Sequence, residues 1–271
     1  SLVFLAEETS LGELFSLKIT RFEDNAGKEL KGISYDKQHD ISTLAKRIPD
    51  HPFVMKPQES FLCFQDVSIL KEIASSTLME GVISHVKKRE QGGESSQAID
   101  IFNEETNLKS FYFEKCDYLP GPELFDAIDT KNLPSIDKVQ FVFAQLLSAL
   151  GHLHEHDVAH RDVKLENLVF DFFGNLKLVD FGYAGIFSEE IPLAKTHCGS
   201  PDYASPEILY EGDYDPFRAD SWAVGVIIYG IMAGHFPFIG KSFEEVRRKV
   251  LETTPNYSSS RFQGEPESLT V

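Results

Sequence analysis

The feature that most constrains this chain is a series of four short polar segments between residues 160 and 222. They read HRDVKLEN at 160–167, DFG at 180–182, SPE at 205–207 and DSW at 220–222. Any one triplet occurs often by chance, but the long first segment followed in order by the other three does not. Together they supply carboxylates, an amide and a lysine, which suit oxygen-preferring metal ions and phosphate groups.

The order and spacing of these segments resemble the signature set of eukaryotic-type serine/threonine protein kinases. Residues 119–125 (LPGPELF) and 196–207 (THCGSPDYASPE) resemble the calmodulin-dependent and AMP-activated kinase group. The resemblance is strong from about residue 116 to 238, weak before that and absent after about 250. It implies an α+β, bilobal protein-kinase-like fold. An antiparallel β-sheet N-lobe with one main helix would precede a mostly α-helical C-lobe whose last helices are not matched.

The resemblance divides the chain into three parts. A degenerate N-lobe would cover 1–116, with an exposed insertion near 75–98, and the C-lobe would cover 117–254. The polar tail 255–271 is expected to be loosely held, because chain ends with few apolar residues seldom pack.

Local patterns in the first lobe favour short elements. Leu14–Thr20 and Ile41–Ile48 are typical of β-strands, and Lys109–Lys115 of one strand of a hairpin with Ile99–Phe102. The apolar residues of Glu59–Ile73 recur at helical spacing, which predicts a helix.

Patterns in the second lobe are longer and clearer. Ser135 is expected to cap an amphipathic helix that runs to about Glu155. Two strands, Leu168–Phe170 and Leu176–Val179, should flank a tight turn, and the apolar segment Asp220–Gly234 should form a buried helix.

The resemblance implies roles for the residues of the matching segments. Asp162 would accept the proton of the substrate hydroxyl, and Lys164 would offset the charge of the transferring phosphoryl group. Asn167 and Asp180 would hold Mg²⁺ through oxygen atoms. The resemblance implies three residues of the activation segment and its contacts. Thr196 would be a phosphosite, and Arg161 would be the cation that binds its phosphate. Glu207 would be the glutamate of the segment 205–207. For Thr196 the alternative is an unmodified loop hydroxyl.

The nucleotide-binding residues of the first lobe match the family less well. Residues 11–16 (LGELFS) keep only Gly12 of the usual three glycines, so a strand turn without a phosphate role is the alternative. Lys46 matches the strand lysine that grips the phosphates, with a solvated surface lysine as the alternative. Leu44 would then crowd the adenine. Asp66 falls where the partner of that lysine is usually Glu, although Glu59, Glu72 or a simple exposed carboxylate are alternatives.

The remaining implied contacts lie near the start of the C-lobe. Asp117, Leu119 and Val169 would line the ATP site. Glu123 and Glu166 would bind basic residues before the acceptor, with Glu123 alternatively a first-turn residue favoured by the helix dipole. Gly230 replaces a third carboxylate that some relatives carry. The implied ligands are therefore ATP, Mg²⁺ and protein substrates with basic motifs, and an upstream kinase would act on the activation segment.

Composition limits the other functions. Lys and Arg total 26 against 43 Asp and Glu, and the resulting net charge of −17 disfavours nucleic acid and anionic membranes. No apolar run approaches the length of a membrane span, which is about 20 residues. The three cysteines are widely spaced, which favours a reducing intracellular compartment, cytoplasmic or nuclear.

Three hypotheses follow from these observations. The first is an active ATP- and Mg²⁺-dependent serine/threonine kinase, favoured by the complete catalytic and metal-binding set. The second is a pseudokinase or scaffold module with weak or no turnover, favoured by the degenerate first lobe. The third is a non-functional fragment, which would expose apolar surface of its helical lobe.

Overall fold

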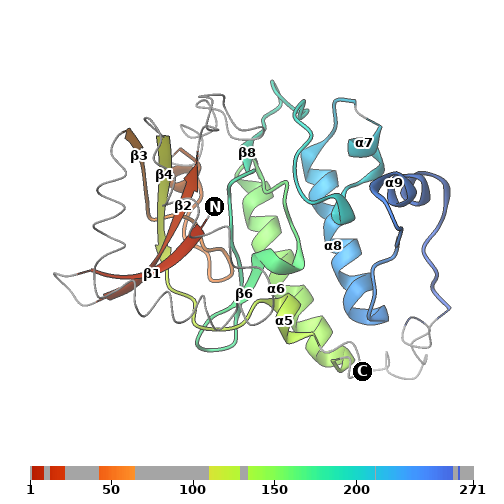
Figure 1. Ribbon diagram of the computed structural model, residues 1–271, viewed down its shortest axis with the longest axis horizontal. Coiled ribbons are helices and arrows are strands. Elements are labelled where there is room, and N and C mark those ends of the chain that lie inside the picture. Colours follow the sequence, from red (N-terminus) through yellow and green to blue (C-terminus); the bar gives the residue numbers. More distant parts are fainter. Residues whose placement is uncertain are drawn as a thin grey trace. The chain divides into compact units, whose positions relative to one another are not determined.

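The computed structural model describes residues 2–8, 13–21, 43–64, 110–128, 134–210, 212–258 and 262 (Figure 1). The chain divides into two compact units, the first formed by Ser1–Ala45 with Pro57–Tyr118 and the second by Lys46–Lys56 with Leu119–Val271. The first is built on an antiparallel sheet and the second mainly on helices, which is the α+β, bilobal class expected from the sequence.

The first unit contains a four-stranded antiparallel sheet with the order β1-β2-β4-β3. Its strands are β1 (Leu2–Glu8), β2 (Glu13–Arg21), β3 (Glu59–Phe64) and β4 (Ser110–Asp117). The strands predicted at Leu14–Thr20 and Lys109–Lys115 are confirmed. The helix predicted from Glu59 is wrong over Glu59–Phe64, because these residues pair with β4, Phe61 opposite Phe113. Ile99–Phe102, Asp66 and the insertion near 75–98 lie outside the described residues.

The strand predicted at Ile41–Ile48 is also wrong, because residues 43–47 are helical. Leu44 and Ile48 are each only 1% exposed and lie four residues apart. That spacing places two side chains on one face of a helix. The helical period was therefore present, but over too few residues to be distinguished from a strand.

The second unit is described by the following elements. They are α5 (Leu124–Ala127), α6 (Ile136–Glu155), β5 (Val158–Ala159), η1 (Leu165–Asn167), β6 (Leu168–Phe170), β7 (Leu176–Leu178), β8 (Gly185–Ile186), η2 (Pro201–Tyr203), α7 (Pro206–Leu209), α8 (Pro216–Ala233) and α9 (Phe243–Glu252).

Helices α6 and α8 pack side by side and form the centre of the second unit (Figure 1). The predicted α6 is confirmed, with Glu155 as its last residue. Ser135 lies at the N-cap position as expected, but its side chain makes no capping hydrogen bond. The predicted buried helix is confirmed as α8, which Asp215 caps by accepting a hydrogen bond from the Phe217 amide at 3.0 Å. The side-chain carbonyl of Gln145 on α6 accepts a hydrogen bond from the Leu176 amide at 2.6 Å, which ties α6 to β7.

A tight turn joins β6 and β7, as predicted. Its geometry comes from Asp171, whose Oδ1 accepts hydrogen bonds from the amides of Phe173 at 2.9 Å and Asn175 at 2.8 Å. Gly174 adopts a left-handed backbone with φ of 81°, which favours glycine. The turn fixes the register of the hairpin, and β7 leads directly to Val179 and Asp180.

The described part of the tail contacts α8, although the tail was expected to be loosely held. The Tyr229 hydroxyl donates a hydrogen bond to the Asn256 carbonyl at 2.8 Å, and the Phe262 ring lies 5.1 Å from the Tyr229 ring. Within the described ranges, none of the helices combines the length and apolar character that crossing a membrane requires.

Candidate active site

The catalytic loop of the second unit is held by one buried carboxylate on α8. Asp220 is 1% exposed and accepts hydrogen bonds from two successive loop amides, His160 at 2.8 Å and Arg161 at 2.7 Å. The Nε2 atom of His154, on α6, lies 3.1 Å from Oδ2 of the same carboxylate. A buried carboxylate needs such donors to offset its loss of hydration. Asp220 therefore joins α6, α8 and the start of the catalytic loop.

His160 links the catalytic loop to the segment that ends in Asp180. It is fully buried, and its Nε2 lies 3.0 Å from the Val179 carbonyl. Its Nδ1 accepts a hydrogen bond from the Asp162 amide at 3.3 Å, so the ring spans both segments. The ring also packs edge-on against Phe181 at 5.1 Å. His160 thus sets the distance between the two parts of the site that carry carboxylates.

Two residues of the site adopt a left-handed backbone. Arg161 has φ of 62° and Asp180 has φ of 65°, a conformation that costs free energy for residues with a side chain. At Arg161 the two Asp220 hydrogen bonds hold the chain in this turn. The Arg161 Nε donates to the Tyr183 carbonyl at 2.6 Å, and its guanidinium lies 5.4 Å from the centre of the Phe187 ring.

Asp162 lies at the centre of a polar cluster. Its Oδ2 is 2.8 Å from the Lys164 ammonium, and its Oδ1 accepts a hydrogen bond from the Ser200 hydroxyl at 3.0 Å. Lys164 also donates to the Ser200 hydroxyl at 2.9 Å. The structure therefore brings together the predicted pair Asp162 and Lys164, and adds Ser200, which sequence reasoning missed. Its position between Gly199 and Pro201, inside the segment 196–207, was the available signal.

Asn167 is placed to offer an amide oxygen to a metal ion. Its side-chain Nδ2 donates to the Asp162 carbonyl at 2.8 Å and to Asp162 Oδ2 at 3.2 Å. These two hydrogen bonds direct the Oδ1 atom of Asn167 away from Asp162. Its carbonyl accepts a hydrogen bond from the Val179 amide at 3.0 Å, so Asn167 lies beside the residue that precedes Asp180. Asp180 receives the Gly182 amide at 3.1 Å on Oδ1. One amide oxygen and one carboxylate on adjacent segments fit the ligand chemistry of Mg²⁺.

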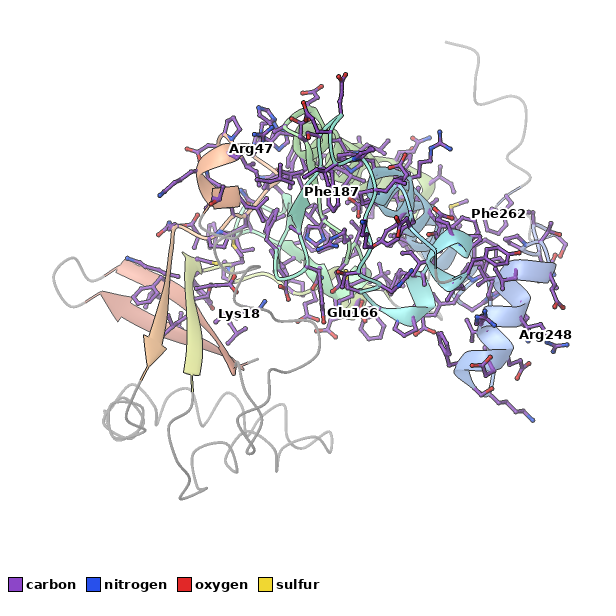
Figure 2. All side chains as sticks on the ribbon, turned by 90° about the horizontal axis from the view of Figure 1, so that it is seen from above. Lys18, Arg47, Glu166, Phe187, Arg248 and Phe262 are labelled. Atoms are coloured by element: carbon purple, nitrogen blue, oxygen red, sulfur yellow. The ribbon has the colours of Figure 1, made fainter. Side chains whose placement is uncertain are left out.

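The side chain of Glu166, which is labelled in Figure 2, is exposed. A buried tyrosine orients its carboxylate. The Tyr203 hydroxyl donates to Glu166 Oε2 at 3.2 Å and accepts a hydrogen bond from the Leu165 amide at 3.4 Å. Burial, and then the Glu166 charge, raise the pKa of Tyr203 above its ordinary value. The hydroxyl therefore stays protonated and keeps Glu166 facing outward.

The activation segment is joined to the loop before α8. Ala194 and Tyr214 exchange two backbone hydrogen bonds of 2.8 and 3.0 Å, and the Tyr214 hydroxyl donates to the Thr196 carbonyl at 3.2 Å. Burial is the main cause that raises the pKa of Tyr214 to about 12. The side chain of Thr196 is exposed. This leaves Thr196 accessible while its backbone is fixed.

Gly199 is a second residue that sequence reasoning missed. Its φ is 96°, and an added Cβ would lie 2.6 Å from the Arg161 carbonyl. No side chain fits at that distance, so glycine allows the activation segment to approach the catalytic loop. The approach brings Ser200 to Asp162.

Lys46 is not the strand lysine that the sequence suggested. It lies in the helical stretch 43–47 and is exposed. Leu44 is buried beside it in the same stretch, so the expected crowding of adenine by Leu44 is unsupported too. Glu13–Ser16, expected in a phosphate-covering loop, are instead strand residues of β2, while Gly12 lies outside the described residues. The strand assignment of Lys46 and Leu44 was therefore made at the wrong place in the sequence.

Lys18 on β2 has the properties expected of the strand lysine. Its side chain, which is labelled in Figure 2, is 14% exposed. Its Nζ lies 4.0 Å from Oε1 of Glu114, whose side chain is 4% exposed. Lys18 and Glu114 are register partners on β2 and β4. The signal in the sequence was the run Ser16-Leu17-Lys18-Ile19, in which a lysine shares one strand face with a small residue.

The other predicted residues lie at the ends of their elements. Asp117 ends β4, and its carbonyl accepts a hydrogen bond from the Ser16 hydroxyl at 3.1 Å. Leu119 follows at the start of the second unit and is half-buried. Val169 on β6 forms an antiparallel bridge with Glu123, which precedes α5. The structure thus brings Val169 and Glu123 together.

Glu207 is half-buried on α7 and makes no hydrogen bond or ion pair with another described residue. The nearby arginine Arg247 instead donates its Nε to the Leu209 carbonyl at 3.0 Å.

At Gly230, an added Cβ would have no neighbour within 4 Å. A cavity of about 240 Å³ opens there, and its apolar lining includes Phe125, Leu165 and Phe236.

We predict that Asp220→Asn lowers the free energy of unfolding by about 2–3 kcal/mol, because the amide would direct N–H groups at backbone donors. Chemical denaturation measures the change. The matched control is Asp215→Asn at the N-cap of α8, where the aspartate also pairs with the exposed Arg218 at 3.3 Å and where Asn caps the helix equally well. Equal losses in the two variants would contradict the anchoring role of Asp220.

Comparison with known proteins places this geometry in a family. Residues 96–268 match the family described as protein kinase domain. The chain is 33% identical over 191 residues to CBL-interacting serine/threonine-protein kinase 18 of Arabidopsis thaliana, covering 68% of this chain and 36% of that protein. It is 40% identical over 134 residues to CBL-interacting serine/threonine-protein kinase 24 of the same plant, covering 49% and 30%.

A third relative is the serine/threonine-protein kinase SIK2 of Gallus gallus, 35% identical over 144 residues that cover 53% of this chain and 18% of that protein. The chain thus spans about a third or less of the length of these curated relatives. The family match covers more than half of the chain and includes residues 160–167, 180–182 and 196–207. The chain belongs to the protein kinase domain family, within the calmodulin-dependent and AMP-activated group of eukaryotic serine/threonine kinases.

Proposed function

We propose that the chain transfers the γ-phosphoryl group of ATP, with Mg²⁺, to serine or threonine hydroxyls of protein substrates. The observation that carries the proposal is the cluster in which Asp162 contacts Lys164, Ser200 and Asn167. Phosphoryl transfer requires positioning and charge stabilisation, and this cluster supplies fixed examples of both. The three relatives described above are each named as serine/threonine-protein kinases, which agrees with it.

The proposed reaction moves one phosphoryl group and one proton. The substrate hydroxyl oxygen forms a bond to the γ-phosphorus while the bond from that phosphorus to the bridging oxygen of ADP breaks. The hydroxyl proton passes to Asp162. Lys164, 2.8 Å from Asp162, offsets negative charge on the transferring group. Ser200 holds Asp162 from the other side.

Asn167 and Asp180 are the proposed metal ligands, because their oxygens lie on adjacent segments joined through Val179. Bound Mg²⁺ would neutralise charge on the nucleotide phosphates. In the described part of the chain no cluster of three or more His, Cys, Asp and Glu side chains is placed to hold a metal ion. An Asn–Asp pair completed by phosphate oxygens and water therefore suits a nucleotide-linked ion rather than a resident one.

For the nucleotide we propose Lys18 as the phosphate-gripping lysine, in place of Lys46. Asp117, Leu119 and Val169 remain proposed contacts of the base and ribose. We place the protein inside the cell, where ATP is available, and the free thiol of Cys198 agrees with a reducing compartment.

For the substrate we propose a preference for arginine before the acceptor. Glu166 is exposed and oriented by Tyr203, and Glu123 lies at the start of α5. Arginine pairs with carboxylates through two parallel hydrogen bonds, so it should bind better than lysine. Gly230 offers no third carboxylate, which argues against a second strict basic position in the substrate.

We also propose that an upstream kinase phosphorylates the exposed Thr196 and that Arg161 is the cation that binds the new phosphate.

The proposed reaction predicts that Asp162→Asn and Asp180→Asn each lower turnover on the order of 100-fold or more, because one removes the proton acceptor and the other a metal ligand. Phosphate incorporation into a basic peptide measures this. Asp171→Asn, the same change in the β6–β7 turn, should leave turnover unaltered. Full activity in either site variant would refute the assignment, and an inactive wild type that binds Mg-ATP would favour the pseudokinase.

The revised lysine assignment predicts that Lys18→Met weakens Mg-ATP binding by about tenfold or more, which corresponds to about 1.4 kcal/mol. Lys46→Met should bind as the wild type does. Removing Lys18 also removes its contact with the buried Glu114, so the double variant Lys18→Met with Glu114→Gln separates binding from folding. Calorimetric titration decides, and wild-type affinity in the double variant would exclude Lys18.

The proposed substrate preference predicts that Glu166→Gln lowers kcat/KM for peptides with arginine before the acceptor by about tenfold, the loss of one charged hydrogen-bonded pair. Peptides with alanine there should lose little. A positional peptide array measures both, with Glu155→Gln on the exposed face of α6 as the control. An unchanged array profile in Glu166→Gln would contradict the preference.

A further inference from the structure

Three histidine rings stack at the surface of the second unit, away from the site described above. The His51 and His152 rings lie 4.5 Å apart with an interplanar angle of 20°. The His152 ring on α6 and the His156 ring at the C-cap of α6 lie 4.6 Å apart and are tilted by 49° to each other. The stack therefore fastens residues 46–56 to the C-terminal half of α6.

The hydrogen bonds of His51 define which of its nitrogens carries the proton. The Phe53 amide donates to Nδ1 at 3.3 Å, so Nδ1 acts as an acceptor. Nε2 lies 3.3 Å from the Ser148 hydroxyl and carries the hydrogen of the neutral ring. His152 is held similarly, with its Nε2 3.1 Å from the Pro49 carbonyl. This arrangement requires His51 to be neutral.

The residues that follow His51 extend the β6–β7 hairpin. Leu178 donates its amide to the Phe53 carbonyl at 2.9 Å, and its carbonyl accepts from the Met55 amide at 2.9 Å. Val54 forms a parallel bridge with the same residue. Leu178 is the last residue of β7 and lies two residues before Asp180. One hydrogen bond at His51 is thus connected through Phe53 to the strand that delivers Asp180.

The charged groups around the stack do not favour a cation at His51. Lys177 on β7 and His152 on α6 both lower the pKa of His51, after burial, which is the largest cause. The nearby carboxylates are engaged elsewhere, Asp50 with Lys56 at 3.0 Å and Asp157 with Arg47. His156 donates its Nδ1 hydrogen to the His152 carbonyl at 2.8 Å and adds a further titratable ring.

We propose that His51 is a positioning residue for the Asp180 turn, which it supports only while its imidazole is neutral. Protonation would add a hydrogen to Nδ1, where the Phe53 amide already points, and would place a cation beside Lys177 and His152. The segment Phe53–Met55 would then lose its hold on Leu178. The catalytic consequence rests on the proposed phosphoryl transfer, whereas the structural consequence does not.

The lowered pKa of His51 in the folded protein determines how the free energy of unfolding changes with pH. In the unfolded chain His51 titrates near its ordinary pKa of about 6.5, and in the folded protein its pKa is lower. Between these values the unfolded chain binds more protons, so the free energy of unfolding falls as the pH falls. The stabilisation is complete above about pH 6.5 and is lost as the pH drops through the folded-state pKa.

The test compares His51→Asn with the wild type between pH 8 and pH 5. Asn accepts a hydrogen bond from the backbone amide two residues on, as His51 Nδ1 does, but does not titrate. Denaturation midpoints and hydrogen exchange of the Leu178 and Met55 amides are measured at each pH. Ser148→Ala is the matched control, because it removes the partner of Nε2 and leaves the titration of Nδ1 intact.

We expect the wild type and Ser148→Ala to lose stability and amide protection below about pH 6.5, and His51→Asn to lose less. The kcat of the phosphoryl transfer should decline over the same range and decline less in His51→Asn. Parallel losses in all three proteins overturn the proposal. If His51→Asn does not fold, NMR titration of wild-type His51 decides, and a pKa at or above the ordinary value overturns it. Stability and exchange are measurable even if the chain has no kinase activity.

Discussion

The structure of the second unit depends on the buried carboxylate of Asp220. A charge that is 1% exposed is tolerated only where donors surround it, and here the donors are two successive backbone amides and a histidine. Because the acceptor is rigidly placed on α8, the catalytic loop must approach with those amides in one orientation. The unusual backbone of Arg161 and the position of Asp162 follow from that orientation.

From this anchor the site is built by a short series of contacts. His160 spans the loop and the Val179 carbonyl, and Asn167 receives the Val179 amide, so the Asp180 segment is held at two points. Gly199 lets the activation segment come close enough for Ser200 to reach Asp162. Each contact uses a backbone group on at least one side or a very short side chain, which keeps the carboxylates within narrow limits.

The second unit was largely predictable from the sequence, and the first was not. Helix α6 and the β6–β7 turn have long apolar periods or strong turn residues, and the catalytic segments are long enough to be specific. Lys46 was assigned because it follows two apolar residues, Leu44 and Ala45, whereas Lys18 follows Ser16 and Leu17. Short strands offer too few residues to decide the register. Ser200 and Gly199 act through approach between distant segments, which local patterns do not encode.

The left-handed backbones of Arg161 and Asp180 cost free energy of folding at two positions of the candidate active site. At such positions Gly or Asn is conformationally easier than the residue present. A laboratory selection for heat resistance alone would accept Asp180→Gly if relief of the backbone strain outweighed loss of the Gly182 hydrogen bond to the Asp180 carboxylate. The selected variant would lack the carboxylate that is proposed to hold the metal ion. Asp180 therefore carries a conformational cost that glycine at this position would not carry.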